Sequence, residues 1–120
     1  PKLQSLTLNS SHLRDNDMAA IAACSHLRYL DISDNNDLTN AAIAQLKPLK
    51  ELAVLQMPFT AINAKGILTL KGLPLARLRI EQKQANSEDV TALNKAFPKL
   101  QIDIENMKKE LFNDYKAAFQ

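Results

Sequence analysis

Apolar residues recur along the chain in one motif, in which two leucines three positions apart are followed two positions later by a third aliphatic residue. Four copies and a shorter fifth begin at Leu3, Leu27, Leu49, Leu75 and Leu100, at spacings of 24, 22, 26 and 25 residues. The last apolar residues of each copy alternate with other residues, as in Leu6-Thr7-Leu8. That alternation is the period of a short strand with one buried face. The pattern predicts a strand in every copy.

A stretch with helical spacing follows each of the first four predicted strands. Apolar residues three or four positions apart mark these stretches: Met18, Ile21 and Cys24; Ile43 and Leu46; Ile67 and Leu70; Val90, Leu93 and Phe97. Polar residues suited to capping a helix N-terminus precede them, namely Asp15 or Asn16, Thr39, Asn63 and Ser87. We therefore expect strand, turn, helix and return loop to repeat about every 24 residues.

The repetition predicts an α/β fold with a short parallel sheet on one side and helices on the other. One strand and helix cannot bury their own apolar faces, whereas stacked copies bury a continuous core. An ordinary α/β domain with a parallel sheet would show a similar alternation of strands and helices. The matching leucine offsets favour the repeat fold over that alternative.

The segment from Leu38 to Leu46, Leu-Thr-Asn-Ala-Ala-Ile-Ala-Gln-Leu, resembles the helix half of a leucine-rich repeat of the ribonuclease-inhibitor-like or F-box-associated type. The resemblance covers nearly the whole chain. It implies a solenoid with its sheet on the concave side and its helices on the convex side. The ninth repeat position in that family is often Asn or Cys. Here it is occupied by Ser11, Asn35, Met57 and Lys83, so we expect irregular turns in the third and fourth repeats.

Residues 1–105 are thus expected to form the repeats, and residues 106–120 a C-terminal capping helix. An apolar stripe at helical spacing supports that helix: Met107, Leu111, Phe112, Tyr115, Ala118 and Phe119. Alternatively, the helix docks into a groove of a partner. The first strand has no comparable cover. We therefore expect either a C-terminal section of a longer repeat protein or self-association through the uncapped N-terminal edge.

Composition limits the function classes. Of the 120 residues 46% are apolar, but only 5% are aromatic and none is Trp, so the core must consist of Leu, Ile and Ala. The net charge of +2, without a basic stripe, does not suggest nucleic-acid binding. The longest apolar run, from Met18 to Cys24, is too short to span a membrane. The single cysteine favours a reducing compartment, and we expect the protein in the cytoplasm of the source cell, or of a host cell if it is an effector.

Candidate chemistry is sparse, and we expect neither an enzyme nor a bound cofactor or metal. The sequence lacks phosphate-loop, nucleophile-elbow and zinc-helix motifs. Asp31, Ser33, Asn35 and Asp37 imitate the start of a calcium loop, but its sixth position is Asn36 and its twelfth is Ala42. A strand followed by an Asn-rich turn explains this run better. His12, Cys24 and His26 are too few for a structural zinc site, and Cys24 fits a core position better than a nucleophile.

The resemblance implies that exposed strand positions on the concave face bind a partner. These positions form three rows: Ser5, Tyr29, Glu51 and Arg77; Thr7, Asp31, Ala53, Arg79 and Asp103; Asn9, Ser33, Leu55, Glu81 and Glu105. The predicted partner-binding residues are Tyr29, Asp31, Glu51, Leu55, Arg77, Arg79 and Glu81. Tyr and Arg are favoured interface anchors. Alternatively, the charges only form cross-strand pairs, Glu51 with Arg77 and Arg79 with Asp103.

The sequence favours a protein-interaction module with a protein partner. The alternatives are the substrate-recognition part of a larger enzyme, such as a ubiquitin-ligase subunit or a bacterial effector, and a purely structural array that spaces or dimerises other domains.

Overall fold

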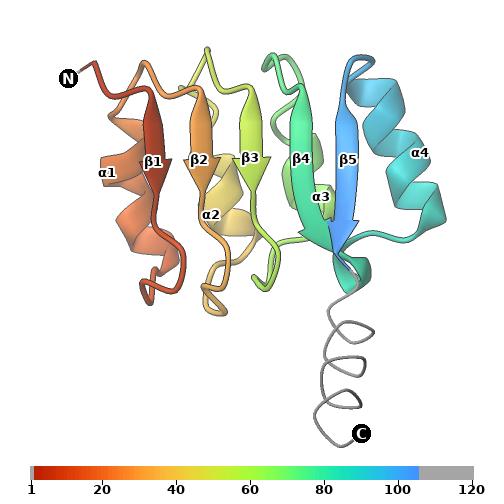
Figure 1. The fold of residues 1–120 in the computed structure, drawn as a ribbon, viewed down its shortest axis with the longest axis horizontal. Coiled ribbons are helices and arrows are strands. Elements are labelled where there is room, and N and C mark those ends of the chain that lie inside the picture. Colours follow the sequence, from red (N-terminus) through yellow and green to blue (C-terminus); the bar gives the residue numbers. More distant parts are fainter. Residues whose placement is uncertain (1, 106–120) are drawn as a thin grey trace, which may run out of the picture.

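The computed structural model describes residues 2–105, which form one sheet of five parallel strands with helices between them. The strands lie side by side in chain order (Figure 1): β1 (Ser5–Thr7), β2 (Tyr29–Asp31), β3 (Val54–Gln56), β4 (Arg77–Glu81) and β5 (Gln101–Glu105). The α-helices are α1 (Met18–Ala22), α2 (Asn40–Ala44), α3 (Ala64–Leu68) and α4 (Ser87–Ala96), and two 3₁₀ turns are η1 (Asp15–Asp17) and η2 (Gln82–Gln84). The capping helix expected at 106–120 lies outside the described residues.

Helices α1, α2 and α3 all lie behind the sheet, on the same face (Figure 1). Helix α2 packs against α3, and α3 packs against α4. An ordinary doubly wound α/β domain carries helices on both faces of its sheet. The arrangement therefore confirms an α/β repeat fold, in which each unit stacks on the previous one.

The core fills the space between the sheet and the helices. Leu30, Leu55 and Leu78 are paired in register on neighbouring strands, and all three are fully buried. Ile32, Met57 and Ile80 form a second fully buried row two residues further on. From the opposite side, Ile43 of α2 and Ile67 of α3 close the layer. Burying each such side chain stabilises the fold by about 1.5–3 kcal/mol. The core is mainly aliphatic, as its composition predicts, but Met18, Met57 and Phe97 also belong to it.

The structure corrects the frame of the third repeat, which begins at Leu52 instead of Leu49. The register pairs Leu30 with Leu55, so the central strand residues 6, 30, 55, 78 and 102 are 24, 25, 23 and 24 residues apart. Leu49, Leu52 and Leu55 follow one another at intervals of three, so the motif fits in two overlapping frames. The observed frame buries Leu55, which the predicted frame exposes, and makes Met57 a core residue instead of a turn residue, so hydrophobic burial selects it.

Buried polar side chains hold the turns that follow β2, β3 and β4. Asn35 donates to the carbonyls of Leu8 and Ile32 at 3.0 and 2.9 Å, and accepts from the backbone N–H of Leu13 at 2.9 Å. In the corrected frame Thr60 takes the equivalent position in the third repeat, where Asn35 and Thr60 form a β-bridge. In the fourth repeat the Gln84 side chain donates to the carbonyl oxygens of Met57 and Ile62. The turns of the third and fourth repeats thus differ from the second, because Thr60 bonds backbone groups only within its own turn and Gln84 lies in a 3₁₀ turn, but their side chains still hydrogen-bond to backbone groups.

Two of the four predicted helix N-caps are confirmed, and the cap expected at Asp15 or Asn16 is wrong because Asp17 is the N-cap residue of α1. Thr39 and Asn63 accept hydrogen bonds from the backbone N–H groups of Ala41 and Lys65. Helix α4 is capped by Asn86, one residue before the predicted Ser87, in a reciprocal capping box with Asp89. Before α1, the Asp17 carboxylate accepts from the backbone N–H of Arg14 at 2.8 Å.

Candidate functional site

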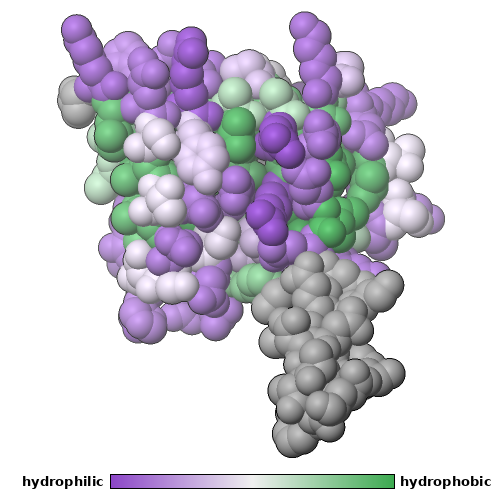
Figure 2. All heavy atoms as spheres, viewed as in Figure 1, coloured by the Kyte–Doolittle hydropathy of each residue, from purple (hydrophilic) through white to green (hydrophobic). Residues whose placement is uncertain are grey.

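The face of the sheet opposite the helices carries the strand side chains that point out of the core. We call it the open face and define it by Ser5, Thr7, Tyr29, Asp31, Val54, Gln56, Arg77, Arg79, Gln101, Asp103 and Glu105. All of these residues are exposed or half-buried. Figure 2, which looks onto this face, shows near-neutral residues over β1 and β2 and strongly hydrophilic residues over β4. The two halves of the face therefore differ in chemistry.

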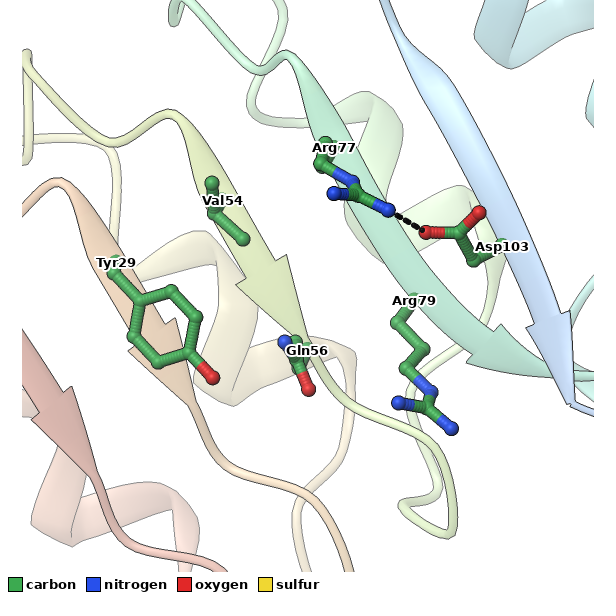
Figure 3. A pocket seen from close by; sticks show the side chains of 6 residues that line it. All are labelled: Tyr29, Val54, Gln56, Arg77, Arg79 and Asp103. Atoms are coloured by element: carbon green, nitrogen blue, oxygen red, sulfur yellow. Dashed lines mark hydrogen bonds and ion pairs between the residues drawn. The ribbon is translucent and has the colours of Figure 1, made fainter.

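A hollow of about 320 Å³ lies in the middle of the open face. The residues that line it come from β2, β3, β4 and β5: Tyr29, Val54, Gln56, Arg77, Arg79 and Asp103 (Figure 3). The register places Val54 between Tyr29 and Arg77. Because valine is shorter than either neighbour, it forms a floor between the phenol and the guanidinium. In-register stacking of three strands thus creates the hollow.

Both arginines of the hollow form ion pairs with β5. Arg77 donates from Nη2 to an oxygen of Asp103 at 3.0 Å, and Arg79 donates in the same way to Glu105. The register puts Gln101 opposite Arg77 and Asp103 opposite Arg79, so each pair runs diagonally between the strands. The arginine side chains remain 58% and 44% exposed, and such exposed pairs contribute at most about 1 kcal/mol each.

The structure brings together only some of the predicted site residues. Tyr29, Asp31, Arg77 and Arg79 lie on the open face, as expected from their strand positions. Leu55 is completely buried in the core, and this placement overturns its predicted exposure. Glu51 precedes β3 instead of belonging to it. Its carboxylate contacts Nδ1 of His26 at 3.0 Å, so the expected Glu51–Arg77 pair is wrong.

Glu81 is also absent from the exposed surface, because it is only 8% exposed. Its carboxylate accepts a hydrogen bond from the backbone N–H of Phe59 at 3.1 Å, and its own N–H donates to the Gln84 side chain at 2.7 Å. Glu81 therefore connects the turns after β3 and β4. The expected Arg79–Asp103 pair is likewise replaced by the diagonal pairs.

The residues of the hollow that the predicted rows of exposed positions lack are Val54 and Gln56. Both belong to the strand whose frame was misplaced by three residues. The length of the interval between repeats could have identified them, because the observed frame makes the spacing nearly uniform. Even spacing is what stacked strands of one sheet require.

The segments with candidate metal-binding or catalytic residues have structural roles. Asp31 accepts from the hydroxyl and the backbone N–H of Ser33, and Asn35 is buried in the turn, so the run from Asp31 to Asp37 is a strand end and its turn. His26 contacts Glu51, and Cys24 Sγ lies 3.8 Å from the carbonyl oxygen of Ala20. Within residues 2–105 no cluster of three His, Cys, Asp or Glu residues is arranged to hold a metal.

Residues 23–44 match the family model described as Leucine Rich repeat. The matched segment runs from the end of α1 through β2 to the end of α2, which is one structural unit of the stack. A search of curated proteins found no match to the chain. In the part of the chain that the structure describes, no helix is long and apolar enough to cross a membrane. The match and the parallel sheet with its helices together support a leucine-rich repeat family, whose repeats generally mediate protein–protein interaction and are typically not catalytic.

Proposed function

We propose that this chain is a protein-interaction module that binds a partner protein through the open face of its sheet. The observation that carries the proposal is the hollow on that face, where Tyr29 and two arginines surround an apolar floor. Tyr and Arg are enriched among the residues that dominate binding energies, and such residues cluster near the centre of an interface. The hollow lies on the three middle strands and the adjoining β5, so a partner centred on it would contact most of the sheet.

Among residues 2–105, α1, α2 and α3 lie behind the sheet and α4 lies beside β5 (Figure 1), and the open face that they leave uncovered supports the same proposal. In a repeat of the ribonuclease-inhibitor-like type the open face would be the concave side of a solenoid. Side chains on strands of a rigid sheet are held in fixed positions, so binding there requires little ordering of loops. Among residues 2–105 the open face combines this rigidity with exposed Tyr and Arg side chains.

The proposal is tested by measuring partner binding with open-face and helix-face variants. The immobilised chain captures proteins from the source cell, and the affinity of the captured partner is then measured with the purified protein. We expect Tyr29→Ala and Arg77→Ala each to weaken binding by about tenfold or more, the effect of a strong interface residue. Lys65→Ala, in the exposed part of α3, is the matched control and should bind like the unaltered chain. Normal binding by both open-face variants would refute the proposal.

A further inference from the structure

The hollow on the open face has room for one side chain of a partner. Neighbouring strands lie about 4.8 Å apart, so Tyr29 and Arg77, which flank Val54 on either side, are separated by about 10 Å at the backbone. Figure 3 shows the Tyr29 ring on one side of the hollow and the two guanidinium groups on the other. A side chain that enters from above would touch an apolar floor, an aromatic wall and a cationic wall.

The cationic wall keeps hydrogen-bond donors for a ligand. A guanidinium has five N–H donors. The ion pairs with Asp103 and Glu105 use the Nη2 group of each arginine. Arg77 directs its other terminal nitrogen away from Asp103 and toward β3 (Figure 3). The Tyr29 hydroxyl on β2 and the Gln56 amide on β3 provide further donors.

We propose that the hollow binds an aspartate or glutamate side chain from an acidic segment of the partner protein. This inference rests on the proposed function and names the chemistry that the open face recognises. The carboxylate would accept hydrogen bonds from Arg77 and Arg79, and its methylene groups would pack against Val54 and the Tyr29 ring. Carboxylates and guanidinium groups match in geometry and charge, and their hydrogen bonds are stronger than neutral ones.

The charge of the hollow favours a carboxylate over a phosphate group. Phosphate-binding sites cluster cations that have few acidic neighbours, because a phosphate ester carries a charge of about −1.5 to −2. Here Asp103 is part of the lining, and Glu105 neutralises the second arginine. The four charges therefore sum to zero, and the hollow offers a ligand the unused N–H donors of the two arginines instead of a net positive charge. The acidic side chains of β5 repel a monovalent carboxylate less than a divalent phosphate ester.

The test is a nuclear magnetic resonance titration of the isotope-labelled chain at low salt with three blocked tetrapeptides. They are acetyl-Ala-Leu-Glu-Ala-amide, its Gln counterpart and its phosphoserine counterpart. We expect the Glu peptide to shift the backbone amide signals of Val54, Gln56 and Arg77 in a saturable way, and to bind about fivefold more tightly than the Gln peptide. The phosphoserine peptide should not bind more tightly than the Glu peptide. Arg77→Gln should remove the preference for Glu, whereas Lys95→Gln, the same charge change on α4, should retain it.

Four results would overturn the inference. Three concern the peptides: no saturable shifts with the Glu peptide, equal binding of the Glu and Gln peptides, or tighter binding of the phosphoserine peptide than of the Glu peptide. The fourth is an equal loss of the preference for Glu in Arg77→Gln and Lys95→Gln. The spectrum of each variant shows directly whether it is folded. Failure of the proposed function would be seen in a different measurement, the affinity of Tyr29→Ala and Arg77→Ala for the captured partner, so the two failures can be distinguished. If Tyr29→Ala abolishes partner binding while the Glu peptide fails, the open face binds a partner through other chemistry.

Discussion

The side-chain nitrogen of Gln84 donates a hydrogen bond to the hydroxyl of Thr60 at 3.0 Å, across the turns that follow β4 and β3. Both residues are buried. The same nitrogen faces the carbonyl oxygens of Met57 and Ile62, at 3.0 and 2.9 Å, and the Gln84 side-chain oxygen accepts from the N–H of Glu81. One side chain thus satisfies backbone groups of two neighbouring repeats.

We expect Gln84→Ala to destabilise the protein by about 2–3 kcal/mol, because a buried polar group left without its partner costs about 1–3 kcal/mol and several would be affected. Urea denaturation followed by circular dichroism measures the difference. Gln82→Ala is the matched control, since Gln82 is exposed in the same 3₁₀ turn, and it should change stability by less than about 0.5 kcal/mol. Equal stability of the two variants would show that the turn is not held by Gln84.

Leu55 and Val54 test the frame of the third repeat. Leu55 is completely buried, whereas its neighbour Val54 is half-buried on the open face. Leu55→Ala should therefore lower the free energy of unfolding by about 2–5 kcal/mol, as for other buried leucines. Val54→Ala should cost clearly less, because the smaller side chain loses fewer contacts. The reverse order in a denaturation experiment would support the frame that begins at Leu49.

The sequence predicts the repeats, the parallel strands and the caps of α2 and α3 because all of these depend on local sequence patterns. Leu30 has one aliphatic frame available, so its strand follows from the pattern alone. The third repeat differs, since Leu49, Leu52 and Leu55 permit two frames. Only the stacking of three strands decides between these frames, by burying Leu55 and Met57. The hollow depends on the same register and could not be predicted without it.

The site also depends on side-chain geometry that periodicity does not contain. Alternation predicts that Glu81 points outward, but the chain turns into η2 directly after β4. The carboxylate instead meets the N–H of Phe59, whose φ of 62° places that residue in the left-handed region. The diagonal pairing of Arg77 with Asp103 follows from the reach of a long side chain toward the next strand.

Gly66 and Asn40 should be energetically coupled. A Cβ added at Gly66 would clash with Oδ1 of Asn40, which also accepts from the backbone N–H of Asn63 at 2.9 Å. Gly66→Ala must therefore displace Asn40 and break its hydrogen bonds to Asn63. The loss exceeds the gain of about 1 kcal/mol that Ala brings to a helix, and we expect net destabilisation.

In an Asn40→Ala background the Asn40 amide no longer occupies the space of a methyl group at position 66. Gly66→Ala should then destabilise the protein much less, or stabilise it. A double-mutant cycle, measured by urea denaturation, should give an interaction energy of about 1 kcal/mol between the two positions. Additive effects would mean that Asn40 adapts to the new methyl group without losing its hydrogen bonds.

Asp103 should limit ligand binding while contributing little to stability. Its carboxylate pairs with Arg77 at 3.0 Å, but the two side chains are 40% and 58% exposed, so the pair is weak. We expect Asp103→Asn to change the free energy of unfolding by less than about 1 kcal/mol.

The Asp103→Asn substitution also removes a negative charge from the hollow and a competitor for Arg77. The affinity for the Glu tetrapeptide should therefore rise about two- to fivefold, and more at low salt than at high salt. Asp17→Asn removes an equal charge before α1, outside the lining of the hollow, and should leave the affinity unchanged. If Asp103→Asn weakens peptide binding, the carboxylate positions Arg77 for the ligand instead of competing with it.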